Sequence, residues 1–205
     1  MEQAPNQSIP YAIYEYATNR QFFNVYSYLQ IDQLKLEIVD YNREQRRHVR
    51  SAVCWLDVGR AKLLVHRALS GRAIGWKFES FGGSERDGAI ESRIFRFEHD
   101  TVNGQFAKFP YRLTIETGQG KRTVTGGYSP VGKPHTQVSI RLPEEDLEII
   151  CLEIRDYLQA HQFRVERVRR GAQRQAYEER QAARDTTDDL PRPASPARQA
   201  GAYRS

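Results

Sequence analysis

The sequence is poor in cysteine, with two in 205 residues, and it has no long hydrophobic run. Cys54 and Cys151 form no CxxC pair and no cluster with histidine, which argues against a zinc site. No stretch approaches the ~20 apolar residues that cross a bilayer. Residues 1–5 lack the basic region and apolar run of a secretory signal. These absences predict a soluble, cytoplasmic protein that holds no metal or cofactor.

Each cysteine lies in an apolar stretch of the sequence. An unpaired cysteine in such a setting behaves as a small hydrophobic residue. We therefore expect two buried free thiols, although the sequence leaves a disulfide between them open.

Recognisable catalytic groups are lacking as well. The five histidines show no metal-ligand spacing. Glu98-His99-Asp100 is the most suggestive polar trio, but neighbours on a strand point to opposite faces. No serine or cysteine has the context of a nucleophile. We do not expect an enzyme, and an enzyme with an unrecognised site is kept as a minor alternative.

Positive charge is concentrated near the C-terminus. The chain carries a formal charge of +5, and residues 163–205 hold ten Arg against six acidic residues. The remaining residues hold 21 basic and 20 acidic side chains. If this body binds nucleic acid, its charges must be sorted by face rather than held in bulk.

Residues 106–161 show the clearest secondary-structure pattern. Apolar and polar residues alternate over 109–116, as in a half-buried strand. Turn residues at 117–121 and a second arm at 122–125 predict a hairpin. A further strand is expected at 137–142. A helix follows Pro143, with one apolar stripe made of Leu147, Ile150, Cys151, Ile154, Tyr157 and Leu158.

The N-terminal part repeats this order of elements. Strands are predicted at 9–16, 24–31, 34–39 and 48–56, with a bulge or tight bend at 32–33. Asp57 is placed to cap a helix through its carboxylate. That helix has its own apolar stripe and ends at Ser70-Gly71. The stripe consists of Ala61, Leu64, Val65, Ala68 and Leu69.

The two helical stripes correspond at a constant offset of 86 residues, although few residues are identical. We therefore predict an α+β fold in which an antiparallel sheet followed by an amphipathic helix occurs twice. The expected segments are a loose 1–9, a first repeat at 10–71, a second repeat at 72–161 and a basic tail at 162–205. Between the repeats, 75–81 and 91–100 are strand candidates, and 82–88 is predicted as a flexible loop.

The tail has two parts. Beyond His161 the helix is expected to continue in a polar register through Arg180. Residues 185–205 lack core-forming side chains and are predicted to be disordered.

Helices that cover one face of a sheet leave its other face free to bind. Basic side chains can pair with phosphates, and aromatic rings can stack on unpaired bases. The candidate nucleic-acid-binding residues are Lys35, Arg46, Arg47, Trp76, Lys77, Arg93, Phe95, Arg96, Arg112, Lys121, Arg122, Tyr128 and Lys133. Each of these residues can equally be a solvating side chain that discourages sheet-edge aggregation.

Two loops add to these candidates. Residues 46–50 form the densest basic cluster of the body, at a predicted hairpin tip, where they could clamp a backbone or simply be solvated. Residues 126–134 suggest a mobile flap that carries Tyr128 and Lys133. This flap lacks the GxxxxGK[ST] pattern of a nucleotide-binding loop.

The order of elements over residues 10–161, with strand-to-helix junctions at 53–69 and 138–158, resembles the Whirly and transcriptional-coactivator superfamily of single-stranded DNA-binding proteins. It is also similar to related proteins carried by conjugative elements and plasmids. The Lys/Gly-rich patch of that family is not cleanly present. The resemblance implies sequence-tolerant binding of single strands on the sheets, and dimerisation through helices, either between chains or internally as a pseudo-dimer.

The sequence therefore predicts a non-catalytic protein that binds single-stranded nucleic acid, DNA in preference to RNA. Replication, repair, conjugative transfer and transcription are all compatible processes. The alternative is a protein-interaction module that uses an aromatic sheet face.

Overall fold

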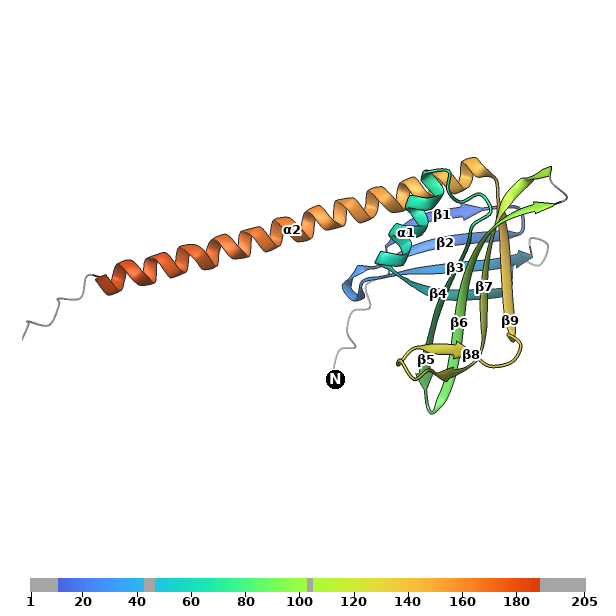
Figure 1. Ribbon diagram of the computed structural model, residues 1–205, viewed down its shortest axis with the longest axis horizontal. Helices are drawn as coiled ribbons and strands as arrows, with labels where there is room; N and C mark the ends of the chain where they lie inside the picture. The colour runs from blue at the N-terminus through green and yellow to red at the C-terminus, as the bar shows by residue number, and fades with distance from the viewer. Residues whose placement is uncertain (1–10, 43–46, 103–104, 189–205) are drawn as a thin grey trace, which may run out of the picture. The chain divides into compact units, whose positions relative to one another are not determined.

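The computed structural model describes residues 11–42, 47–102 and 105–188 (Figure 1). The chain divides into two compact units, 1–158 and 159–205. The first unit contains every strand. The second contains the C-terminal part of the long helix α2, and the two units are described separately.

The first repeat is a four-stranded antiparallel sheet, sheet A, with strands in the order β1-β2-β3-β4. The tight bend predicted near residue 32 is present as a short 3-10 turn, after which Asp32 adopts a positive φ of 56°. The elements are β1 (Ala12–Ala17), β2 (Gln21–Tyr28), β3 (Gln33–Asn42), β4 (Arg47–Asp57) and helix α1 (Val58–Leu69).

The second repeat has the same order. Strands β5, β6, β7 and β9 form sheet B, and the short β8 pairs with the end of β7. The elements are β5 (Lys77–Arg86), β6 (Ala89–Val102), β7 (Gln105–Arg122), β8 (Tyr128–Pro130), β9 (Thr136–Leu142) and α2 (Glu144–Asp188). The predicted α+β fold with a duplicated sheet-plus-helix order is confirmed.

Both repeats share one hydrophobic core. The strands of sheet A run across those of sheet B (Figure 1), and the two inner faces contact each other. Each helix also contacts the first strand of the opposite repeat. Tyr16 of β1 hydrogen-bonds Asp146 of α2, and Arg60 of α1 lies over the ring of Phe78 in β5. The predicted free, buried state of both cysteines is confirmed.

Two glycine-rich segments predicted as turns are strands instead. The hairpin predicted at 117–121 is wrong, because β7 continues without a turn to Arg122. Gly118 and Gly120 are needed for close packing. A Cβ at Gly118 would lie 3.1 Å from the Cα of Pro134, and a Cβ at Gly120 would lie 2.9 Å from a backbone nitrogen. The loop predicted at 82–88 is likewise mostly strand, and its turn is confined to Asp87 and Gly88, both at positive φ.

Helix α1 has the predicted boundaries, whereas helix α2 extends beyond its predicted end. Asp57 precedes α1 but makes no side-chain capping bond; its carboxylate accepts a hydrogen bond from Gln33 at 3.1 Å. Helix α2 continues past His161 as predicted and runs to Asp188 rather than to Arg180, and 189–205 lie outside the described residues. No described helix is both long and apolar enough to cross a membrane.

Candidate binding surfaces on the two sheets

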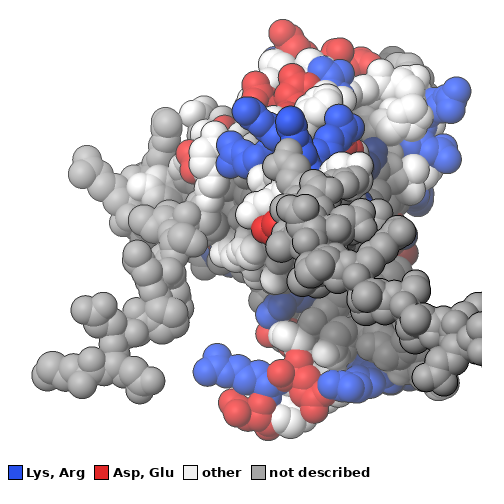
Figure 2. Space-filling view, turned by 90° about the vertical axis from the view of Figure 1, so that its left-hand side faces the viewer, with Lys and Arg blue, Asp and Glu red and all other residues white. Residues whose placement is uncertain are grey.

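The outer face of each sheet, the one turned away from the shared core, carries several of the predicted binding residues. On sheet B this face presents Lys77, Arg96 and Arg112, as the strand alternation requires. Each of these cations has acidic neighbours on the same face. Figure 2 shows another side of the molecule, on which Lys and Arg side chains gather in places and acidic side chains lie beside them.

Glu98 joins two of these cations. Its carboxylate lies 2.5 Å from a guanidinium nitrogen of Arg112 and 3.6 Å from Nζ of Lys77. The hydrogen bond from Arg112 is the main cause that lowers the pKa of Glu98, with the charges of Arg112 and Lys77 adding to it. A phosphate must compete with this carboxylate to reach either cation.

Arg96 makes the second set of ion pairs. Its two terminal nitrogens lie 2.9 Å from Glu79 and 3.2 Å from Glu116. Its side chain is about one-third exposed, at 33%. Sheet B therefore presents a lattice of alternating charges across three strands, and the three predicted cations are largely neutralised.

Of the aromatic residues predicted to stack on bases, Phe95 belongs to the core and its prediction is corrected, whereas Trp76 is half-buried against that core. Phe95 is 1% exposed and packs against Phe78. Trp76 is half-buried, with its ring against Phe78 and Phe97 and the guanidinium of Arg67 over it. In this structure Phe95 offers no ring face to a ligand, and the main contacts of Trp76 stabilise the core.

The far end of sheet B holds four further candidates. Lys121 and Lys133 are exposed, whereas Arg122 forms an ion pair with Glu85 at 2.8 Å. The ring of Tyr128 covers Gly83, where a Cβ would come within 2.7 Å of it. The ring of Tyr128 therefore packs on Gly83 of β5. Lys121 and Lys133 are better placed than Tyr128 and Arg122 to bind an anionic ligand.

Three predicted arginines do not join these surfaces. Arg93 lies on the inner side of β6, the same side as Phe95, and forms an ion pair with Glu91 at 2.9 Å. Arg46 lies outside the described residues. Arg47 begins β4, and its side chain also lies outside the described part of the structure.

The outer face of sheet A carries an aromatic patch, which we define as Tyr26, Tyr28, Lys35 and Trp55. The register places Tyr26, Lys35 and Trp55 in one row across β2, β3 and β4. The rings of Tyr28 and Trp55 meet edge to face with centroids 4.5 Å apart. Nζ of Lys35 lies 4.9 Å from the Tyr26 ring centre and 3.6 Å from Glu37. All four patch residues are half-buried.

The phenol of Tyr26 in this patch is neutral near neutral pH. Burial, together with Glu37 and Glu15, raises the pKa of Tyr26 above its usual value, so its phenol stays protonated. Aromatic rings of this kind offer apolar faces at which bases or apolar side chains can stack.

Only Lys35 of this patch was among the predicted binding residues. Tyr26 and Tyr28 lie two residues apart in β2, and Trp55 lies in β4, with β3 between them. Only the strand register therefore brings the three rings together. The sequence signal that could have found them is the tyrosine pair at alternate positions of β2, facing opposite to the buried Val25.

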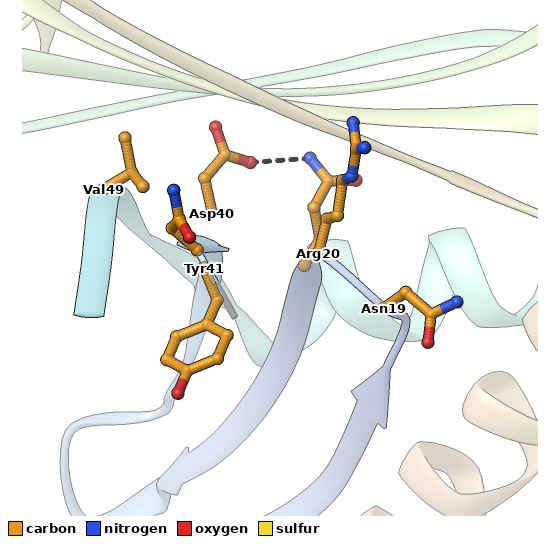
Figure 3. Close-up of a pocket in the computed structure, with 7 residues that line it drawn as sticks. Asn19, Arg20, Asp40, Tyr41 and Val49 are labelled. Atoms are coloured by element: carbon orange, nitrogen blue, oxygen red, sulfur yellow. Dashed lines mark hydrogen bonds between the residues drawn. The ribbon is translucent and has the colours of Figure 1, made fainter. Parts of the chain in front are cut away.

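A polar hollow of about 790 Å³ lies at the end of sheet A (Figure 3). Its Asp40 accepts hydrogen bonds from Gln21 at 2.7 Å and from Arg50 at 2.5 Å. Gln21 also donates to the carbonyl of Ser139 in β9 at 2.7 Å. These contacts link the two sheets, so Asp40 has a structural role. No group of three or more potential metal ligands occurs in the described part of the chain.

Comparison of the chain with family models, with curated proteins and with solved structures found no match in any of the three.

Proposed function

We propose that this protein binds single-stranded nucleic acid, without catalysis, on the aromatic patch of sheet A. The observation that supports the proposal is the row of half-exposed rings beside Lys35 on a sheet face opposite the core. Stacking on such rings contributes ~1–3 kcal/mol per base and tolerates any sequence.

Single strands suit this patch better than duplex. Bases in a duplex have their faces covered by their neighbours, whereas unpaired bases can be splayed onto aromatic rings. The proposed preference for DNA over RNA rests only on the resemblance of the element order to a superfamily of single-stranded DNA-binding proteins. The patch holds one cation, already 3.6 Å from Glu37, so stacking rather than phosphate pairing supplies most of the binding there.

Fluorescence anisotropy of a labelled oligo-dT and a matching duplex, over a salt series, tests the proposal on the full chain. We expect the single strand to bind more tightly than the duplex. Trp55→Ala should weaken single-strand binding about tenfold, within the range given for one stacked base. Equal binding of Trp55→Ala and the unchanged chain would show that the patch is not the site.

A protein-interaction module is the second candidate. The acidic Glu15 and Glu37 lie beside the patch on the same face, where they disfavour a polyanion and suit an aromatic-to-aromatic protein contact. Such a protein would bind neither oligonucleotide at any salt concentration tested, and its partner complex would lose affinity with Trp55→Ala.

A further inference from the structure

The part of α2 in the second unit carries the densest group of described cations. Residues 162–177 hold five arginines and one glutamate. All sixteen are exposed to solvent. Arg170 forms an ion pair with Glu166 at 3.5 Å, a surface contact of small energetic value.

Three of these arginines fall on one side of the helix together with two aromatic residues. Phe163, Arg167, Arg170, Arg174 and Tyr177 follow each other at spacings of four, three, four and three residues. This spacing places them in one stripe along an α-helix, about 21 Å long at 1.5 Å per residue. Phe163 is 72% exposed and Tyr177 is 63% exposed, so most of each side chain is accessible to solvent.

We propose that this stripe is a nucleic-acid contact of its own, in which the arginines pair with phosphates and the end rings stack on unpaired bases. The inference rests on the proposed single-strand binding and adds a surface that the sheets do not contain. Charge complementarity with a polyanion selects the partner, since the segment carries a net charge of +4. Arginine's planar fork of donors also matches phosphate oxygens well.

The chemistry of the stripe fits other anionic partners less well. A helix that lies on a membrane presents a broad apolar face beside its cations. Here the apolar Val165 and Val168 lie on the opposite side of the helix from the stripe, and residues 162–177 contain no leucine or tryptophan. An acidic protein would pair with the arginines but presents no row of bases on which both end rings stack.

The helix offers a matched pair of variants. Arg167→Gln/Arg174→Gln removes two charges from the stripe. Arg164→Gln/Arg169→Gln removes two charges from the same segment but off the stripe. Glutamine keeps helix propensity close to that of arginine, which circular dichroism of both variants checks. Affinity of the full chain for labelled oligo-dT is then measured at several salt concentrations.

We expect the stripe variant to bind about tenfold more weakly and to lower the slope of log affinity against log salt by about 1.4, for two lost single-strand phosphate contacts. The matched variant should lose no more than about twofold. An equal loss in the two variants, or no loss in either, would overturn the inference. Stronger binding of the unchanged chain to polyglutamate or to anionic vesicles than to oligo-dT would overturn it as well.

Trp55→Ala in the same series separates this inference from the proposed function. If Trp55→Ala weakens binding and the stripe variant behaves like its match, the sheet proposal stands and the stripe inference falls. If only the stripe variant weakens binding, the sheet proposal falls. An unchanged chain that does not bind oligo-dT would overturn both.

Discussion

The two sheets of this protein have equivalent positions and different outer faces. In each, the second, third and fourth strands contribute one residue to a cross-strand row on the outer side. The two equivalent rows are Tyr26–Lys35–Trp55 in sheet A and Glu98–Arg112–Arg141 in sheet B. One row is mainly aromatic, and the other consists of charged residues, of which Glu98 and Arg112 form an ion pair.

The inner faces differ much less. Phe23 pairs with Ile38 in sheet A, and Phe95 pairs with Ile115 at the equivalent place in sheet B. All four are at most 2% exposed. Packing therefore holds the inner positions to large apolar residues, while the outer positions are free to acquire separate chemistry. The two repeats therefore differ mainly in the chemistry of their outer faces.

The largest expected effect concerns the shared core. Phe23→Ala and Phe95→Ala should each lower the free energy of unfolding by about 3–5 kcal/mol, because each leaves a cavity in a close-packed interior. Since both repeats share this core, either variant should shift one common transition. Denaturant unfolding followed by tryptophan fluorescence tests this, with Trp55 and Trp76 reporting from different repeats. Two separated midpoints in either variant would contradict a single core.

Equivalent cations on the outer faces should differ in their effect on binding. Lys35→Ala should weaken oligo-dT binding about threefold and lower the salt slope by about 0.7, the value for one single-strand phosphate contact. Arg112→Ala should leave binding within about twofold, because Glu98 already engages this guanidinium. Anisotropy titrations of the two variants measure the difference. A larger loss for Arg112→Ala would move the site to sheet B.

Removing the carboxylate that neutralises sheet B should reduce the contrast between the faces. Glu98→Gln frees Lys77 and Arg112 from their shared partner and adds one positive charge to the face. We expect oligo-dT affinity to rise by about twofold at low salt and to be unchanged at high salt, where screening removes the added attraction. As a control, Glu85→Gln removes one carboxylate from a different ion pair, that with Arg122. It measures the effect on affinity of the added net charge alone.

The smallest expected effect is a pH dependence of stability. The folded-state pKa of Glu98 is lowered, so its contribution to stability is present above the pKa of the unfolded chain and is lost as pH falls through the folded value. Glu98→Gln should therefore flatten the acid side of the stability profile. Thermal unfolding of both proteins between about pH 3 and pH 7 measures it. Parallel profiles would show that the ion pairs of Glu98 add no stability.

The sequence predicted the helices and their duplication well because both depend on local periodicity. Ala61, Leu64 and Val65 are buried as their spacing required, as are the residues of the second stripe from Leu147 to Leu158, except the half-buried Tyr157. The prediction of a hairpin at 117–121 was wrong because the glycines were interpreted as turn residues. Gly118 and Gly120 instead allow neighbouring backbone segments to approach closely.

The binding surface was harder to predict, for two physical reasons. Both Ile94 and Phe95 are buried, although they point to opposite faces of β6, because residues 130–134 cover the outer side at Ile94. Alternation therefore gave no means of recognising Phe95 as a core residue. The aromatic patch depends on pairing between strands, and nothing local in the sequence brings Trp55 beside Tyr28.

The most direct test of the central claim is the fluorescence of Trp55 in the Trp76→Phe variant, in which it is the one remaining tryptophan of the chain. Oligo-dT is titrated at a salt concentration at which anisotropy shows binding. Stacking of bases on the sheet A patch predicts saturable quenching of Trp55 with the same midpoint as the anisotropy curve. An anisotropy curve that saturates while Trp55 emission stays constant would contradict the claim.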